Sequence, residues 1–165
     1  MSELILGIDP GEVTGWSLWA LEDDRPIQRL EYGLIKDGRA GWLRLGGMWL
    51  GQLRPGLVIC EKFNEDDGRK GVANLTPIWI EGSIETMCDA LGLEVLMQPT
   101  AAKSQVHDDV LRRAGLYIEN RVAKKDAAIM HQDARDVNDS QIHVLAWAKA
   151  AIDHEPTIAL YWPDR

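Results

Sequence analysis

Four acidic residues form the pattern in this chain that most clearly indicates chemistry. Asp9 ends the first apolar run of the sequence, and Glu61 directly follows a later one. Asp136 and Asp139 stand three residues apart at the expected start of the last helix, so both would project from one helical face. Carboxylates gathered at one point repel one another strongly unless cations neutralise them. If the fold brings these elements together, the sequence therefore predicts a metal site.

The ligand type indicates both the ion and the reaction. Hard oxygen ligands suit Mg²⁺ or Mn²⁺. Two such ions about 4 Å apart can clamp a phosphodiester, one activating the attacking water and the other stabilising the leaving oxygen. Ordinary explanations remain open for each acid, since Asp-Pro-Gly is common in turns, strand ends are often solvated, and helix N-termini favour acids. Asp133 has the same spacing to Asp136 and is a further candidate ligand, whereas His143 is expected to support the site or fill the core.

Apolar periodicity and turn residues predict the elements that would position these acids. The expected strands span residues 3–9, 13–21, 27–35, 57–60 and 93–97. The expected helices span residues 40–53, 76–91, 100–114 and 136–152, and the expected N-caps of the second and third are Thr76 and Thr100. Residues 116–134 are ambiguous and are expected to form a basic helical segment with loops, and residues 156–165 are a tail of unknown placement. This order predicts an α/β fold with a mixed five-stranded sheet, in which a three-strand antiparallel meander joins parallel strands and helices cover both faces.

Length and composition are those of one ordinary globular domain over residues 1–165. Hydrophobic residues make up 45% of the chain, and no apolar run approaches the roughly 18 residues of a membrane helix. Because no signal peptide is recognisable, we expect a cytoplasmic protein. Cys60 and Cys88 are expected to be buried, reduced thiols. The formal charge of −8 argues weakly against a nucleic-acid partner, but a carboxylate site stays acidic until metal binds.

Four segments resemble the motifs of the RuvC family of Holliday junction resolvases, within the RNase H-like superfamily. The segment "GIDPGEVTGW" is similar to the first family motif, and "VICEKF" is similar to the second, an apolar strand that ends in the catalytic Glu. The segment "DVNDSQIHVLAWA" resembles the last motif, and "PTAAKSQV" resembles a family segment around a basic residue. The resemblance covers most of residues 4–150, and the short, loosely spaced form looks most like the phage-encoded members.

The resemblance implies an RNase H-like fold and a homodimeric endonuclease that nicks opposite strands of a four-way DNA junction, with two Mg²⁺ or Mn²⁺ ions in each active site. The metal ligands that it implies are Asp9, Glu61, Asp136 and Asp139. It also implies that Lys103 contacts the scissile phosphate and that Phe63 stacks on bases near the junction centre. Family members carry two lysine-bearing segments, which are merged into one here, so Lys103 aligns with either lysine. These departures from the family pattern leave open the cleavage of other branched DNA. A phage-encoded member would act in the host cytoplasm.

Basic residues are expected to flank the acidic site and to position DNA phosphates. The expected DNA contacts are Lys62, Phe63, Arg69, Lys70, Lys103, Arg112, Arg113, Arg121, Lys124 and Lys125. Taken singly, each of these cations is also consistent with an ordinary solvated surface charge. The helix at 77–91 is the expected dimer face, because Gly82 allows close approach and Trp79 offers a large apolar area. Packing of that helix on its own sheet is the alternative.

Three other functions compete with a DNA endonuclease. A non-catalytic DNA-binding or assembly protein would share this fold, and an RNA-processing nuclease would use the same metal chemistry. Residue types alone do not separate DNA from RNA, because recognition of the 2′-hydroxyl depends on surface geometry. The third alternative is a phosphotransferase of the actin-like ATPase group, whose phosphate-binding loops also begin with Asp-x-Gly. That fold requires two lobes with one such loop each, and this chain has the length and the motif for only one lobe.

Overall fold

Five strands form one mixed sheet in the computed structural model, which describes residues 2–63, 75–118 and 127–163, without the side chains of 127–133. The strands are β1 (Glu3–Asp9), β2 (Thr14–Glu22), β3 (Arg25–Ile35), β4 (Leu57–Lys62) and β5 (Glu94–Pro99). They follow the order β3-β2-β1-β4-β5. The first three strands are antiparallel, and β4 runs parallel to both β1 and β5. The predicted α/β class and mixed five-stranded sheet are therefore confirmed.

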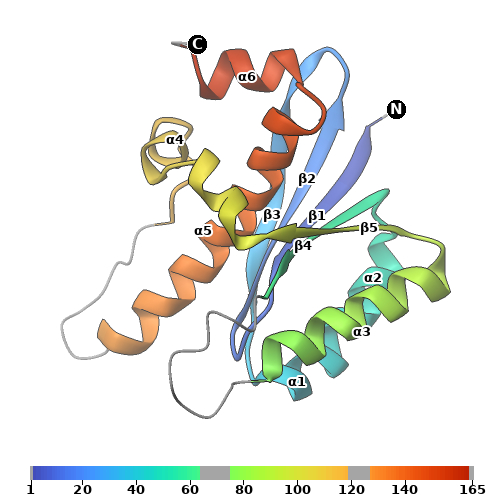
Figure 1. Cartoon of the computed structure of the whole chain (residues 1–165). Coiled ribbons are helices and arrows are strands. Elements are labelled where there is room, and N and C mark those ends of the chain that lie inside the picture. The colour runs from blue at the N-terminus through green and yellow to red at the C-terminus, as the bar shows by residue number, and fades with distance from the viewer. Residues whose placement is uncertain (1, 64–74, 119–126, 164–165) are drawn as a thin grey trace.

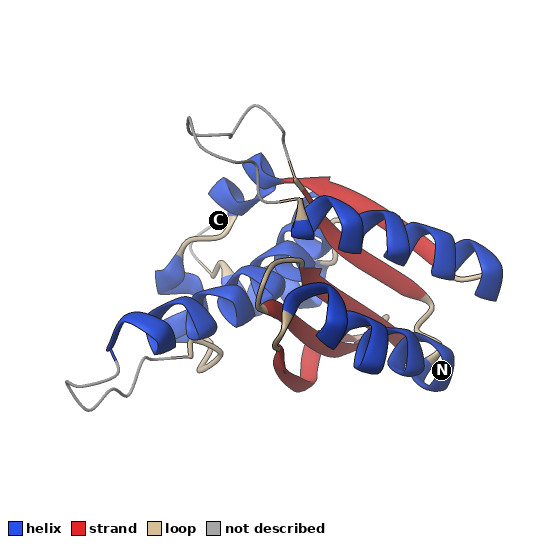
Figure 2. Cartoon of the chain, turned by 90° about the horizontal axis from the view of Figure 1, so that it is seen from below, coloured by secondary structure: helices blue, strands red, loops and turns tan. Residues whose placement is uncertain are grey.

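Helices cover both faces of this sheet (Figures 1 and 2). The helical segments on one face are α1 (Gly38–Gly41), the π-helix η1 (Trp42–Gly46), α2 (Gly47–Leu53) and α3 (Thr76–Leu91). Those on the other face are the 3₁₀-helix η3 (Thr100–Gln105), α4 (Asp108–Arg113), α5 (Ala127–Ala150) and α6 (Glu155–Tyr161). Within the described ranges, none of the helices has the length and apolar character needed to cross a membrane.

Alternate residues of the strands supply two cores, one on each face, because successive side chains of a strand point to opposite sides. Ile5 packs in the core beneath α4 and α5, whereas its neighbour Leu6 packs in the core beneath α2 and α3. Cys60 and Cys88 belong to the second core and are buried free thiols, as predicted. The central strands β1 and β4 are thus held from both sides, which gives the residues at their ends fixed positions.

The prediction of one helix over 100–114 is wrong, because the chain is interrupted between η3 and α4. Val106 and His107 both have extended backbone, with φ of −131° and −87°. Ala102, Val106 and Val110 are nevertheless all buried, at a spacing of four residues. The apolar periodicity continues across the interruption, so periodicity alone could not reveal it.

Several helix boundaries differ from prediction. Helix α5 begins at Ala127, nine residues before the predicted start, so the acids expected to open the last helix lie in its middle. Leu75 and Pro99, rather than Thr76 and Thr100, occupy the N-cap positions of α3 and η3. The C-terminal tail adds α6, which packs on β3.

Two polar contacts attach this last helix to the edge strand. The Ile27 N–H donates a hydrogen bond to Thr157 Oγ1 at 2.9 Å, and the Tyr161 hydroxyl donates to the Ile27 carbonyl at 3.2 Å. Both side chains are buried, so the tail closes the core beneath α5. The edge backbone of β3 at this point is thereby covered rather than left open.

Candidate active site

The register of the central strands brings two of the acids together. Strand β1 pairs in parallel with β4, with Ile8 opposite Cys60. Asp9 and Glu61 follow these residues directly, so both lie at the edge of the sheet where the carboxyl ends of the parallel strands meet. Their carboxyl groups hydrogen bond to each other. Sequence positions 52 residues apart are thus joined by strand pairing alone.

Two glycines in the sheet let α5 approach closely enough to add a third acid. A Cβ atom on Gly7 would lie 2.6 Å from the main-chain oxygen of Ser140, and one on Gly15 would overlap the main-chain oxygen of Asp136. A larger residue at either position would therefore push α5 away from the sheet. The close contact places Asp139 beside the ends of β1 and β4.

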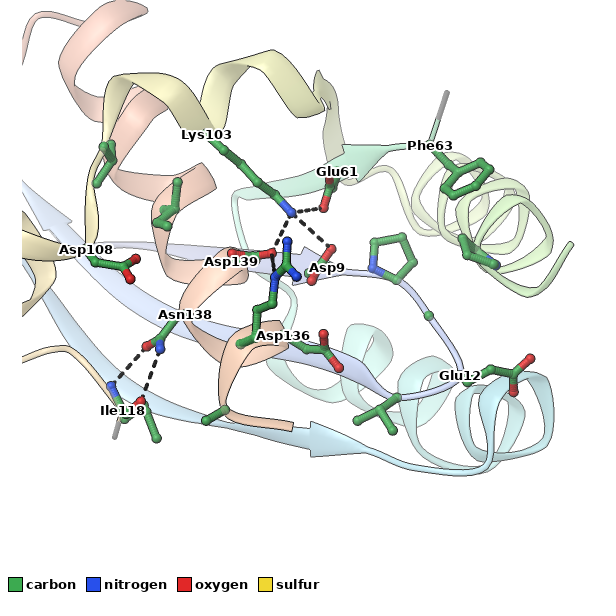
Figure 3. A pocket seen from close by; sticks show the side chains of 18 of the residues that line it. Asp9, Glu12, Glu61, Phe63, Lys103, Asp108, Ile118, Asp136, Asn138 and Asp139 are labelled. Atoms are coloured by element: carbon green, nitrogen blue, oxygen red, sulfur yellow. Dashed lines mark hydrogen bonds and ion pairs between the residues drawn. The ribbon is translucent and has the colours of Figure 1, made fainter. Parts of the chain in front are cut away.

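Lys103 from η3 stands among these carboxylates (Figure 3). Its Nζ lies 2.7 Å from Glu61 Oε2, 2.7 Å from Asp139 Oδ2 and 3.9 Å from Asp9 Oδ1. The three acidic side chains are 11–14% exposed and the lysine side chain is 22% exposed, so these charges are largely removed from water. Asp136 lines the same pocket, one helical turn before Asp139.

Burial and mutual charge shift the pKa values of Asp9, Glu61 and Lys103. Burial raises the pKa of Asp9 well above its ordinary value, and the hydrogen bond with Glu61 raises it further. Burial also acts to raise the pKa of Glu61, but the nearby His143 ring, the Asp9 carboxyl and the charge of Lys103 hold that pKa well below its usual range. Burial acts to lower the pKa of Lys103, and the surrounding carboxylates outweigh it and raise that pKa. The lysine therefore stays cationic, and a proton is held more readily on Asp9 than on Glu61.

Two buried residues fix the groups around Glu61. His143 has Nδ1 2.5 Å from Oε1 of Gln98 and Nε2 3.5 Å from Oε2 of Glu61, which is the supporting position expected for it. Glu81 of α3 accepts a hydrogen bond from the Phe63 N–H at 2.6 Å, and burial raises the pKa of Glu81. Sequence reasoning missed Glu81, because an acid beside the apolar stripe of a helix has the appearance of an ordinary surface residue.

The acidic cluster opens into a pocket of about 1210 Å³. Figure 3 shows Phe63 and Glu12 on one side of the cluster and Ile118 on the other. Asn138 holds that second side in place, since it accepts a hydrogen bond from the Ile118 N–H at 3.0 Å and donates one to the Ile118 carbonyl at 3.1 Å. The pocket wall next to the acids is thus attached to the same helix that carries Asp139.

The structure brings only some of the expected DNA contacts to this pocket. Phe63 and Lys103 line it, and Lys62 is exposed at the end of β4. Arg112 and Arg113 of α4 do not line the pocket themselves, but the Arg112 guanidinium lies 3.9 Å from the ring centroid of Tyr117, which does. Outside the described residues lie Arg69, Lys70, Arg121, Lys124, Lys125 and the side chain of Asp133.

Sequence reasoning also missed a basic residue of the pocket, Arg135. Its Nε lies 3.7 Å from Asp139 Oδ2, four residues further along α5. The signal for it was the i, i+4 spacing between a cation and an acid. The predicted start of the last helix at residue 136 leaves Arg135 outside that helix, and an i, i+4 spacing indicates a side-chain contact only when both residues belong to one helix.

The donor set suits a hard divalent cation, because carboxylate oxygens from three separate elements face one point. Among the residues that the structure describes, no three acidic, histidine or cysteine side chains already stand in a metal-ligand arrangement. Lys103 fills the centre of the cluster with a single positive charge instead. A divalent cation would neutralise the same carboxylates with two charges, provided that the ammonium group moves aside.

Comparison with known proteins gives a match at the level of structure. No family model and no curated protein matches this sequence. Thermus thermophilus RuvC, solved with a Holliday junction substrate, has a TM-score of 0.60 at 17% identity, covering 91% of this chain and 96% of that one. The yeast mitochondrial Holliday junction resolvase Ydc2 has a TM-score of 0.63 at 12% identity, covering 92% and 81%. The fowlpox virus resolvase in complex with Holliday junction DNA has a TM-score of 0.55 at 13% identity, covering 90% and 99%.

These likenesses define the class of the fold. About nine-tenths of this chain matches the structures of resolvases from three separate sources. The chain therefore has the RNase H-like fold of the RuvC-type Holliday junction resolvases, in agreement with the resemblance seen in its motifs. At identities below 20%, this correspondence establishes the fold, and the activity has to be argued from the site.

Proposed function

We propose that this chain is a metal-dependent endonuclease that cleaves four-way DNA junctions and related branched DNA. The observation that carries the proposal is the convergence of Asp9, Glu61 and Asp139 around Lys103 in an open pocket. Solved structures of the same fold include RuvC and the fowlpox virus resolvase, each in complex with a Holliday junction. Stabilisation of the fold does not explain a cluster of buried acids, because apolar side chains of the same volume could fill this space without the cost of desolvating charged groups.

Asp9, Glu61, Asp139 and Asp136 are the residues that would hold the metal in this proposal. One or two Mg²⁺ or Mn²⁺ ions there would supply Lewis-acid stabilisation of the charge that develops on the phosphodiester. Asp9 would release its proton as it becomes a ligand, because only the ionised carboxylate binds a cation well. Lys103 would leave its ion pairs and present its ammonium group to the scissile phosphate in the same pocket.

The DNA surface and the assembly are part of the same proposal. Phe63 lines the pocket beside the acids, and its backbone is fixed by Glu81, which suits a ring that stacks on bases. The further phosphate contacts proposed are Lys62, Arg69, Lys70, Arg112, Arg113, Lys124 and Lys125. A homodimer would use the face of α3 with α2 and η1, where Leu43 and Met48 are exposed. Sedimentation velocity would measure whether the protein is a dimer in solution. We also propose a cytoplasmic location, which would give the protein access to DNA.

Cleavage of a panel of substrates tests the function. Labelled four-way, three-way, flap and linear DNA, and a matching RNA duplex, are incubated with the protein in Mg²⁺, Mn²⁺ or EDTA, in parallel with Asp9→Asn. We expect paired nicks in the four-way junction with either metal and none in EDTA, while Asp9→Asn binds the junction and leaves it intact. Binding without any cleavage by the unaltered protein would favour the non-catalytic alternative. Cleavage of RNA alone would favour an RNA-processing nuclease.

A further inference from the structure

The charge of the pocket wall poses a problem for a polyanionic substrate. Among the described residues that line the pocket, seven are acidic, and the lysine and arginine residues are Lys103 and Arg135, with the exposed His107 beside them. Lys103 is 22% exposed and makes ion pairs with three carboxylates. A phosphate that approaches the pocket from solvent therefore requires a cation nearer the surface than Lys103.

Arg135 has the position and the exposure for this contact. Its side chain is 79% exposed, it lines the pocket, and it stands one turn before Asp139 on α5. The two cations of the pocket thus differ in depth, with the lysine between the carboxylates and the arginine at the solvent side. A guanidinium group offers a planar fork of donors that matches two phosphate oxygens.

The ion pair with Asp139 is too weak to explain why an arginine stands at position 135. The distance from Nε to Oδ2 is 3.7 Å, and exposed pairs of this kind contribute about 0–1 kcal/mol. Asp139 already has the ammonium of Lys103 at 2.7 Å, a shorter and more buried partner. The guanidinium is therefore free to exchange this weak contact for a phosphate, and it becomes freer when Asp139 turns to a divalent cation.

We propose that Arg135 binds a backbone phosphate of the DNA strand at the mouth of the pocket, beside the phosphate that is cleaved. This assignment rests on the proposed function, because it takes branched DNA as the ligand. Arg135 is a substrate-binding residue in this proposal, and it holds the strand in register with the acids of β1, β4 and α5.

Binding of a fluorescein-labelled four-way junction tests the proposal without relying on cleavage. Fluorescence anisotropy is measured in Ca²⁺ over a series of salt concentrations, for the unaltered protein, Arg135→Gln and Arg135→Lys. The matched control is Arg25→Gln, which removes one charge from a side chain that is 72% exposed and pairs with Glu22 between β2 and β3. The melting temperature of each variant checks that it is folded.

We expect Arg135→Gln to raise the Kd about 5- to 20-fold and to reduce the slope of log Kd against log salt by about one, the signature of one lost phosphate contact. Arg135→Lys should keep the slope and recover part of the affinity, because it keeps the charge and loses the fork. Arg25→Gln should stay within about twofold. If the unaltered protein binds and Arg135→Gln behaves as Arg25→Gln does, the role of Arg135 is refuted and the proposed function stands. If the unaltered protein neither binds nor cleaves branched DNA, the proposed function is refuted, and this assignment with it.

Discussion

Replacing Lys103 with methionine would expose how strongly the acidic cluster depends on a cation. The ammonium group makes two close contacts, each 2.7 Å long, with Glu61 and Asp139. Hydrogen bonds between charged groups contribute about 1.5–3 kcal/mol each, and water or a proton taken up by Asp9 would relieve part of the repulsion left behind. We therefore expect Lys103→Met to lower the free energy of unfolding by about 2–4 kcal/mol in EDTA. For a chain of 165 residues this corresponds to a fall in Tm of about 5–15 °C.

Thermal unfolding in EDTA and in Mn²⁺ measures this effect directly. Because Mn²⁺ has no ammonium to displace in Lys103→Met, saturating Mn²⁺ should raise the Tm of the variant by more than it raises that of the unaltered protein. Exposed Arg25 supplies the control, since Arg25→Met removes one positive charge from a side chain that is 72% exposed and should move the Tm by less than about 2 °C.

The pH dependence of the variant has a definite sign. Burial and the neighbouring Glu61 raise the pKa of Asp9, and loss of the Lys103 charge that opposes them raises it further above that of the unfolded chain, so the folded state binds this proton first. The deficit of Lys103→Met should therefore be largest at pH 7 and shrink as the pH falls towards 5. A variant that melts within 2 °C of the unaltered protein in EDTA, or a deficit that Mn²⁺ leaves unchanged, would refute this reasoning.

Two further predictions concern the contacts that position the site. Gly15→Ala should cost at least tenfold in cleavage rate, because its Cβ would overlap the main chain of Asp136 and displace α5, whereas Gly51→Ala, which has open space, should leave the rate within twofold. Equal rates for the two variants would contradict the close contact. Asn138→Ala should lower the free energy of unfolding in urea by about 1–3 kcal/mol, since it leaves the N–H and carbonyl of Ile118 without these partners. A change below about 0.5 kcal/mol would show that water replaces both bonds.

Part of this site could be predicted because its signal is local. Asp9 and Glu61 each follow an apolar run, and an acid at the end of a buried strand is visible in the sequence. Parallel pairing of those strands then brings the two together, as an α/β order of elements implies. Lys103 was predicted from the motif resemblance, because the apolar periodicity of the sequence does not indicate that this lysine lies among the acids.

The remainder depends on contacts between distant segments. The interruption at Val106 and His107 is hidden, because the buried residues keep helical spacing across it. Helix α5 extends back to Ala127 through a stretch without an apolar stripe, and that extension gives Arg135 its relation to Asp139. Glu81 becomes a pocket residue only because α3 packs beside the end of β4.

The most direct test of the central claim is the anomalous scattering of crystals grown or soaked in Mn²⁺. If the acids form a metal site, one or two strong peaks will lie within coordinating distance of Asp9, Glu61 and Asp139, and the Lys103 ammonium will have moved away from at least one of its carboxylate partners. A crystal in high Mn²⁺ that shows no peak there, with Lys103 still in contact with Glu61 and Asp139, would contradict a metal-dependent nuclease.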